Sequence, residues 1–319
     1  LEKRYMRKET EKMKGFSVES AYGEMEHLKK LPDRIWEKQG IAIVAPGTLA
    51  CTYALKKRAS ALGKEDWLFT CPVTEREYSL GKQGRKISET IEKALRKRGT
   101  KGIIVYASCM EVLTQWNLEE IREKIKNPDH IPIESLYRGP LAKRKKAPGE
   151  VLEDVWKRWG IKDREEISFF KTECATKENT EEMPDFQAVV EALENRECDI
   201  LLITPGGCKS ALALKKQDNC VQEIKSTRFS DVFVSKGDWE GAAKEIFQNF
   251  PENRPLFLVG SAVPKAIGLD LQELAYRLEK MGKSVAVINC TGFRSAAEMK
   301  EDIMKGFDKK VYKFLDNTG

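Results

Sequence analysis

The sequence predicts an α/β protein made of two doubly wound, Rossmann-like parallel-sheet domains that form a tandem internal repeat. Short apolar segments alternate with helical stretches, and this alternation requires parallel strands joined by right-handed crossovers. Ile41–Leu55 and Asp199–Leu212 share one pattern, an apolar strand followed by a Pro-Gly turn and a cysteine. At 319 residues the chain exceeds the usual single domain. We therefore expect one domain over residues 1–150 and a second over residues 151–319.

The first half begins with a charged arm and a helix over Val18–Gln39, bent near Pro32. Runs of four or five apolar residues bounded by Gly, Pro or polar clusters then favour strands, and the stretches between them favour helices. In order we expect strand Ile41–Ala45, helix Tyr53–Leu62, a short apolar piece Trp67–Phe69, helix Ile87–Lys97, strand Gly102–Tyr106, helix Leu118–Lys126 and strand Ile131–Leu136.

The second half repeats this order after a linker near residues 141–170, which contains the basic run Lys143–Lys146. The elements expected there are helix Asp185–Asn195, strand Ile200–Thr204, helix Trp239–Phe250, strand Leu256–Val259, helix Leu271–Met281 and strand Val285–Asn289.

Four pairs of landmarks recur at nearly the same spacing. The separation is 157 residues between Cys51 and Cys208, and 156 between Gly81 and Gly237. It is 153 residues for each of two further pairs, Cys109 with Ala262 and Gly139 with Gly292. Agreement within a few residues across four landmarks indicates an internal repeat.

Composition excludes several classes of protein. The sequence has no run of 18 apolar residues and its N-terminus is charged, so we expect no membrane span and a cytoplasmic location. The basic run lacks interleaved aromatic residues, which argues against a nucleic-acid partner. The compartment would keep the eight cysteines reduced, so we expect no disulfide framework. The sequence also lacks a CxxC pair, so any metal cluster must collect its ligands from distant segments.

Three cysteines follow predicted strands, where parallel sheets bind their ligands. Cys51, Cys109 and Cys208 lie at these carboxyl ends, and thiolates are ligands for iron–sulfur clusters. The alternative is that each is a small buried core residue, since free cysteine is often buried. Cys174 lies in a polar stretch where burial does not explain it. Cys71 could substitute for one of these ligands. We interpret the other three cysteines as structural: Cys198, Cys220 and Cys290.

Several motifs occur in the same order in both halves. They are Thr204-Pro205-Gly206-Gly207-Cys208 with its looser form Pro46-Gly47 and Cys51, Thr74-Glu75 leading to Gly81, Ser108-Cys109-Met110, and Thr291-Gly292-Phe293. On these motifs the chain resembles the first domain of the nitrogenase component 1 family. That family includes the molybdenum–iron protein, dark-operative protochlorophyllide reductase and the reductive cyclase of coenzyme F430 synthesis. A full family subunit has three such domains, so this chain is short for the family.

The resemblance implies an oxidoreductase that works anaerobically with an iron–sulfur cluster, most simply a [4Fe–4S] cluster. The two halves would supply complementary ligands, Cys51 and Cys109 from one and Cys174 and Cys208 from the other, with Cys71 or Glu19 as possible replacements for Cys174. Electrons would come from an ATP-dependent iron protein, since the chain has no GxxxxGK[ST] phosphate loop. The chain would form a homodimer or pair with a related subunit, and would reduce a small molecule such as a tetrapyrrole.

Other residues complete the predicted site. Gly47, Gly206 and Gly207 lie at the turns, and Arg138 and Arg294 could bind a carboxylate or phosphate of the substrate or face solvent. Glu75 and Asp231 suit helix caps. The family's cofactor-binding Cys and His pair has no counterpart, and His27 and His130 are expected at the surface, so nitrogen fixation is not predicted. The alternatives are a non-enzymatic scaffold or carrier for a cluster, and a metal-free small-molecule binding protein. No catalytic residue can be assigned.

Overall fold

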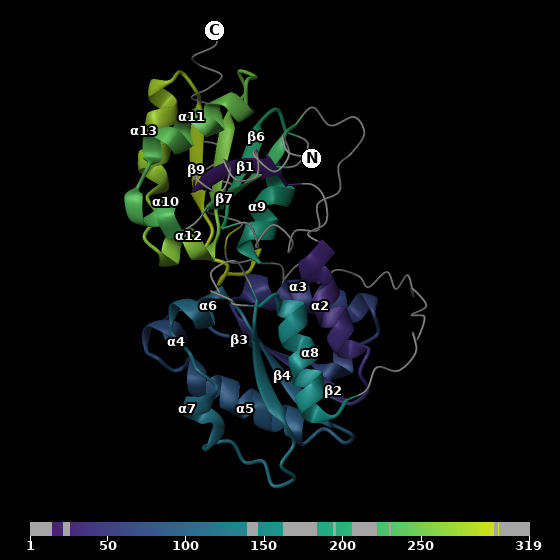
Figure 1. Ribbon diagram of the computed structural model, residues 1–319. Coiled ribbons are helices and arrows are strands. Elements are labelled where there is room, and N and C mark those ends of the chain that lie inside the picture. The colour runs from purple at the N-terminus through teal and green to yellow at the C-terminus, as the bar shows by residue number, and fades with distance from the viewer. Residues whose placement is uncertain are drawn as a thin grey trace. The chain divides into compact units, whose positions relative to one another are not determined.

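A computed structural model describes residues 15–21, 26–138, 146–161, 184–193, 196–205, 222–229, 231–296 and 299 (Figure 1). The chain divides into two compact units. One unit comprises Glu24–Asn179 and the other combines Leu1–Gly23 with Thr180–Gly319. We call them the four-stranded unit and the five-stranded unit, after their sheets. Among the described residues, no helix is both long and apolar enough to cross a membrane.

The four-stranded unit contains a wholly parallel sheet in the order β3-β2-β4-β5. Its strands are β2 (Ile41–Gly47), β3 (Leu68–Pro72), β4 (Gly102–Ala107) and β5 (Ile133–Tyr137). Its helices are α2 (Glu26–Trp36), α3 (Leu49–Ala61), α4 (Glu75–Ser79), α5 (Gln83–Leu95), α6 (Cys109–Leu113), α7 (Glu119–Arg122) and α8 (Pro148–Trp159), with a short 3₁₀ turn η1 (Glu65–Trp67).

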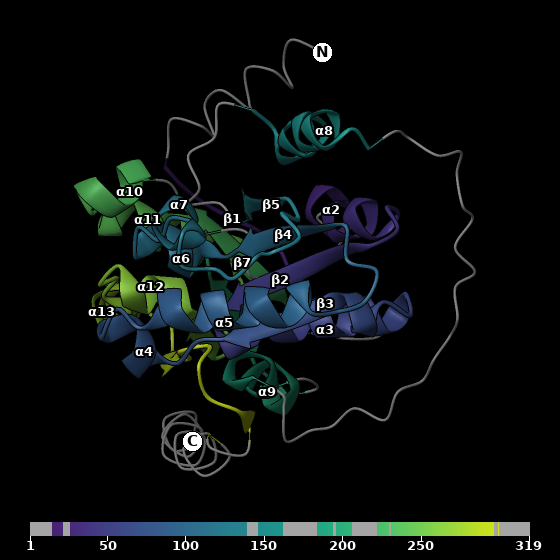
Figure 2. The same cartoon turned by 90° about the horizontal axis from the view of Figure 1, so that it is seen from below.

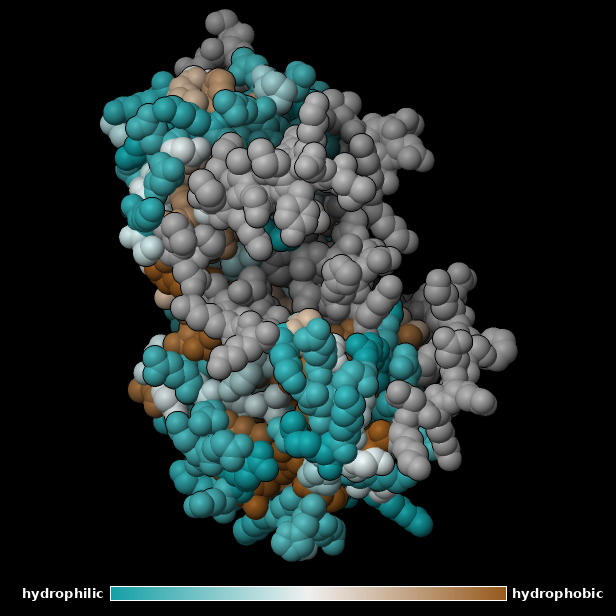
Figure 3. All heavy atoms as spheres, in the orientation of Figure 1, coloured by the Kyte–Doolittle hydropathy of each residue, from teal (hydrophilic) through white to brown (hydrophobic). Residues whose placement is uncertain are grey.

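Helices cover both faces of this sheet. Residues of α2, α3 and α8 pack with β2, β4 and β5 in one hydrophobic cluster, and α5 packs against β2, β3 and β4. Figure 2 shows α8 and α5 on opposite sides of β4. Because both faces are covered, the central strands β2 and β4 are buried along their whole length, as their unbroken apolar sequences predict. The outer surface of α8 is hydrophilic in Figure 3, which agrees with a helix that buries one apolar stripe.

The five-stranded unit contains a sheet in the order β1-β7-β6-β8-β9, in which only β1 is antiparallel. Its strands are β1 (Phe16–Ser20), β6 (Asp199–Ile203), β7 (Ile224–Phe229), β8 (Leu256–Gly260) and β9 (Val285–Asn289). Helix α9 (Asp185–Leu193) covers one face. The other face carries α10 (Asp231–Lys236), α11 (Trp239–Asn249) and α13 (Leu271–Lys280), and α12 (Ala262–Ala266) follows β8.

Strand register confirms the internal repeat. Val44 pairs with Val105 in the four-stranded sheet. Leu201, 157 positions after Val44, pairs with Leu258, 153 positions after Val105. Ile43 pairs with Leu68, and the residues 157 and 156 positions later, Ile200 and Ile224, pair as well. These offsets equal those between the sequence landmarks. The last strand differs by one residue, since Val105 pairs with Ser135 but Leu258 pairs with Val287. The two units therefore share one topology, apart from β1.

The predicted helix over Val18–Gln39 is wrong in its first part. Residues Phe16–Ser20 form β1, which pairs with the edge of β7, and α2 begins only at Glu26. The Phe16 ring packs 4.8 Å from that of Phe233 in the five-stranded unit. This pairing joins residues more than 200 positions apart, and local periodicity carries no information about it.

Other elements form where loops were predicted. Helix α4 lies between β3 and Gly81, β7 and α10 occupy the corresponding stretch of the five-stranded unit, and α8 lies in the predicted linker. Helix α7 is a single turn within the longer helix predicted over Leu118–Lys126. The division into units also differs from a boundary at residue 150, because α8 packs against β5 and β1 pairs with β7. The predicted arm over residues 1–14 lies outside the described residues.

Candidate functional site

The candidate site is the carboxyl edge of the four-stranded sheet, where β2 leads into α3. Thr48 caps α3, and its Oγ1 accepts a hydrogen bond from the Cys51 N–H over 3.4 Å. The extended backbone of Thr48 with its side-chain oxygen suits a helix N-cap. Cys51 is therefore in the first turn of α3, and its side chain is half-buried. A thiol in the first turn lies near backbone N–H groups that have no partner within the helix, a position that suits an electron-rich ligand.

The second predicted ligand of this unit begins a short helix after β4. Ser108 and Glu111 form a capping box, in which Ser108 Oγ accepts from the Met110 N–H and Glu111 Oε2 accepts from the Ser108 N–H over 2.7 Å. Cys109 is the first residue of α6 and is buried. The capping box fixes the backbone on both sides of this cysteine.

Gly47 brings the two segments together at the strand ends. A Cβ atom at Gly47 would lie 3.0 Å from the Cys51 Cβ and 3.1 Å from the Ser108 Cβ. Cys51 and the start of α6 therefore lie on two sides of the same position. Gly47 also has φ of 148°, which residues with side chains rarely adopt. The predicted role of Gly47 at this turn thus has a steric basis.

A buried Tyr–Glu pair lies beside these cysteines and was not predicted. The Tyr78 hydroxyl of α4 donates a hydrogen bond to Glu111 Oε1, and Glu111 is fully buried. Burial, followed by the negative charge of Glu111, raises the pKa of Tyr78 far above its usual value, and the Cys51 and Cys71 thiols act in the same direction. Tyr78 therefore remains a hydrogen-bond donor at physiological pH. The Ser-x-x-Glu spacing at Ser108 was the sequence signal for Glu111; the partner on α4 had none.

Cys71 lies on β3, which is next to β2, the strand that leads into the helix of Cys51. It pairs in register with Pro46 of β2 and is 1% exposed. Burial raises the pKa of the Cys71 thiol to about 11, although a hydrogen bond with Thr90 opposes the shift. The neutral form of this thiol is therefore favoured unless a metal binds it.

Thiol labelling should separate these cysteines in the metal-free protein. At a pKa of about 11 roughly one Cys71 in a thousand is a thiolate at pH 8, and its side chain is buried. We expect iodoacetamide to alkylate Cys51 well before Cys71, because Cys51 is partly exposed. Mass spectrometry of peptides after timed quenching measures this order. Equal labelling rates in folded protein would contradict the placement of Cys71.

The corresponding edge of the five-stranded unit has other side chains at two of these positions. Ser261 precedes α12 with nearly the same backbone angles as Ser108, φ −97° and ψ −179° against φ −90° and ψ −177°. At the positions of Cys109 and Cys71 the five-stranded unit has Ala262 and Thr227, and Thr227 hydrogen-bonds to the backbone of Thr204. Three further predicted ligand or cofactor residues of this half, Gly206, Gly207 and Cys208, lie outside the described residues, as does Cys174.

The two predicted arginines have different surroundings. Arg138 follows β5, and its guanidinium lies over the Tyr106 ring, 5.0 Å from the centroid. Arg294 lies in the loop after β9, and its backbone oxygen accepts a hydrogen bond from the Asp185 N–H over 2.9 Å. The buried Asp185 carboxylate in turn accepts hydrogen bonds from the N–H groups of Thr291 and Gly292, over 2.8 and 2.9 Å, which fixes this loop. Burial raises the pKa of Asp185, against these hydrogen bonds.

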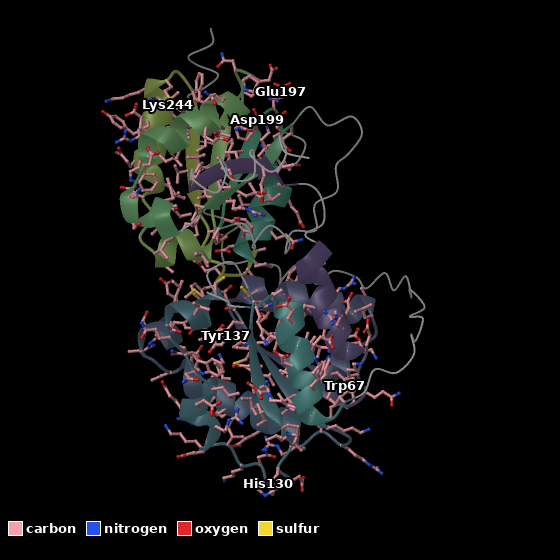
Figure 4. The ribbon with its side chains drawn as sticks, viewed as in Figure 1. Trp67, His130, Tyr137, Glu197, Asp199 and Lys244 are labelled. Carbon is pink, nitrogen blue, oxygen red and sulfur yellow. The ribbon has the colours of Figure 1, made fainter. Side chains whose placement is uncertain are left out.

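The remaining candidates lie away from the edge or have other partners. Figure 4 places Tyr137 at the carboxyl end of β5 and His130 at the opposite end of the same unit. His130 is exposed, as predicted. Glu19 lies in β1 and is 3.6 Å from Arg228, and Glu75 is the exposed first residue of α4. Cys198 and Cys290 are buried, as a structural role requires, whereas the side chains of His27 and Asp231 and all of Cys220 lie outside the described residues.

Within the described parts of the chain, no three His, Cys, Asp or Glu side chains are grouped closely enough to hold a metal ion. The described residues thus offer the two predicted ligands Cys51 and Cys109 at the edge where the cluster was predicted, with the buried Cys71 on the neighbouring strand β3. Thiol chemistry at the start of two helices suits an iron–sulfur cluster. A full ligand set would require residues outside the described ranges.

Comparison with known proteins gives similarity at the level of structure. No protein-family profile matches the sequence. No curated protein matches it either. One solved structure, described as nitrogenase Cp1 at pH 6.5, aligns with this chain at 12% sequence identity and a TM-score of 0.29. The alignment covers 81% of this chain and 75% of the nitrogenase chain.

Proposed function

We propose that the chain is a nitrogenase-like iron–sulfur oxidoreductase component. It would receive electrons from an ATP-dependent iron protein and reduce a small molecule, with a tetrapyrrole as one candidate. The observation that carries the proposal is the approach of Cys51 and the start of α6 on two sides of Gly47 at the carboxyl edge of a parallel sheet. Ligands of doubly wound folds bind at this edge.

Cys51 and Cys109 would hold two corners of the cluster, and Cys174 and Cys208 would supply the other two. When bound, the cluster supplies one-electron transfer. Thr48 and Ser108 cap the helices that carry the two described thiols, so the positions of both cysteines are set by backbone hydrogen bonds. Glu111 joins the start of α6 to α4 through Tyr78 and so limits movement of the edge.

Metal analysis of protein purified without oxygen tests the proposal. We expect about four iron and four sulfide per cluster, and loss of both in Cys109→Ala and Cys208→Ala, because each removes a ligand. Cys198→Ala is the matched control, since Cys198 is buried and hydrogen-bonded to Gln222 of the same unit. Iron-free protein that is folded would refute the cluster, and equal iron in all variants would refute Cys109 and Cys208 as its ligands.

The identity of the remaining ligand can be tested with the same assay. Cys174→Ser should reduce the iron content, whereas Cys71→Ser should leave it nearly unchanged, because the Cys71 thiol is buried and hydrogen-bonded to Thr90. The opposite result would assign three ligands, Cys51, Cys71 and Cys109, to residues 1–150 and make a cluster shared between two chains the better interpretation.

Turnover separates the enzyme from a cluster scaffold or carrier. An enzyme should oxidise its reduced cluster in the presence of substrate, iron protein and ATP. A scaffold should instead transfer iron and sulfide to an acceptor protein without consuming ATP. Mixing experiments with an ATP-dependent iron protein would measure both outcomes.

A further inference from the structure

Arg138 lies at the candidate site, and no carboxylate of the described residues pairs with it. Its backbone N–H donates to Ala107 O over 2.8 Å, which extends the β4–β5 ladder by one residue and fixes the start of the side chain. Its Nη2 is 3.5 Å from Pro46 O, long for a hydrogen bond, and its Nε is buried without a partner. No ion pair among the described residues involves Arg138. By contrast, other arginines of the same unit are paired: Arg34 with Glu153, Arg58 with Asp33, Arg122 with Glu119 and Arg158 with Glu134.

The guanidinium is held across the carboxyl edge. Arg138 starts at β5, passes over the buried ring of Tyr106 at the end of β4, and reaches the carbonyl of Pro46 in β2. Two strand spacings are about 10 Å, so the side chain is extended along this path. The ring attracts the guanidinium and orients its plane. The ring therefore holds the guanidinium at this edge before any ligand binds.

The local electrostatics favour an anion. Pro46 is two residues before the N-cap of α3, a helix of 13 residues. The N-terminal end of a helix carries about half a positive charge, and its first N–H groups lack partners within the helix. The positive charge of the half-buried guanidinium and the partial positive charge of the helix end repel each other. A bound anion would remove this repulsion. Arginine also binds planar oxyanions through two parallel hydrogen bonds.

We propose that Arg138, with the first turn of α3, binds an oxyanion group of the small-molecule substrate, a carboxylate or a phosphate. This inference rests on the proposed function for the presence of a substrate at this edge. It makes Arg138 a binding residue that orients the substrate beside Cys51 and Cys109.

Calorimetric titration of the full chain with inorganic phosphate and with succinate tests the proposal. We expect saturable binding of at least one anion, and the tighter of the two identifies the group. Arg138→Gln should weaken it roughly 10- to 100-fold, the usual effect of losing a hydrogen bond to a charged group. Arg138→Lys keeps the charge without the planar guanidinium, so its affinity for the anion should lie between those of the unchanged protein and Arg138→Gln. Arg158→Gln, which loses an arginine already paired with Glu134, should bind as tightly as the unchanged protein.

Circular dichroism establishes that each variant is folded, and Arg138→Lys carries the test if Arg138→Gln is not. Failure of the folded protein to bind either anion saturably, or equal affinity in the folded Arg138 variant, would overturn the proposal. The titration does not depend on iron content. Its outcome is therefore separate from the metal analysis, and a protein without a cluster could still bind the anion through Arg138.

Discussion

Glu111→Ala is expected to lower the free energy of unfolding by about 3–5 kcal/mol. The substitution leaves the Ser108 N–H and the Tyr78 hydroxyl without acceptors at a buried position, and each unpaired group costs roughly 1–3 kcal/mol. It also opens a small cavity between α4 and α6. Urea unfolding followed by circular dichroism measures the change.

A double-mutant cycle with Tyr78→Phe isolates the buried pair. Tyr78→Phe keeps the ring and removes only the hydroxyl, so the coupling between the two substitutions reports their hydrogen bond. Glu111→Gln is the matched control, because its amide oxygen can still accept from the Ser108 N–H. A loss below 1 kcal/mol in Glu111→Ala would contradict the buried capping box, since the carboxylate would then stabilise little.

Gly47→Ala is expected to cost about 3 kcal/mol or more and to disturb the candidate site. The φ of 148° is unfavourable for alanine by roughly 1–3 kcal/mol. The new methyl group would also approach the Cβ atoms of Cys51 and Ser108 to 3.0 and 3.1 Å, which forces α3 and α6 apart. Thermal unfolding and iron content of the same variant measure the two effects.

Gly63→Ala is the control for backbone strain alone. Gly63 also has positive φ, 60°, but an added Cβ there meets no atom within 4 Å. We expect a cost of about 1 kcal/mol and unchanged iron content, because only the conformational preference of glycine is lost. A Gly47→Ala variant as stable as Gly63→Ala would show that the edge can relax, and would weaken the case that the two thiols are held in place.

The candidate site was predictable only in part. Cys51, Cys109 and Gly47 could be assigned to the edge because strand ends and Pro-Gly turns are local signals. Tyr78 could not, since nothing in the sequence relates α4 to α6. The surroundings of Arg138 and Arg294 also differ, although both were predicted from a nearby turn glycine, because one contacts a ring and the other lies in a loop joined to a buried aspartate.

The sequence by itself determined the parallel α/β class and the repeat. Buried strands of parallel sheets are continuous apolar runs, which are visible in the sequence. Two copies of one topology keep nearly the same spacing between their elements. The offsets of 157 and 156 residues therefore relate the pair Ile43 and Leu68 to the pair Ile200 and Ile224. Only the tertiary structure decided that Phe16–Ser20 is a strand. Its partner β7 is more than 200 residues away, and an edge that offers unpaired N–H and C=O groups overrides a helical pattern that is only local.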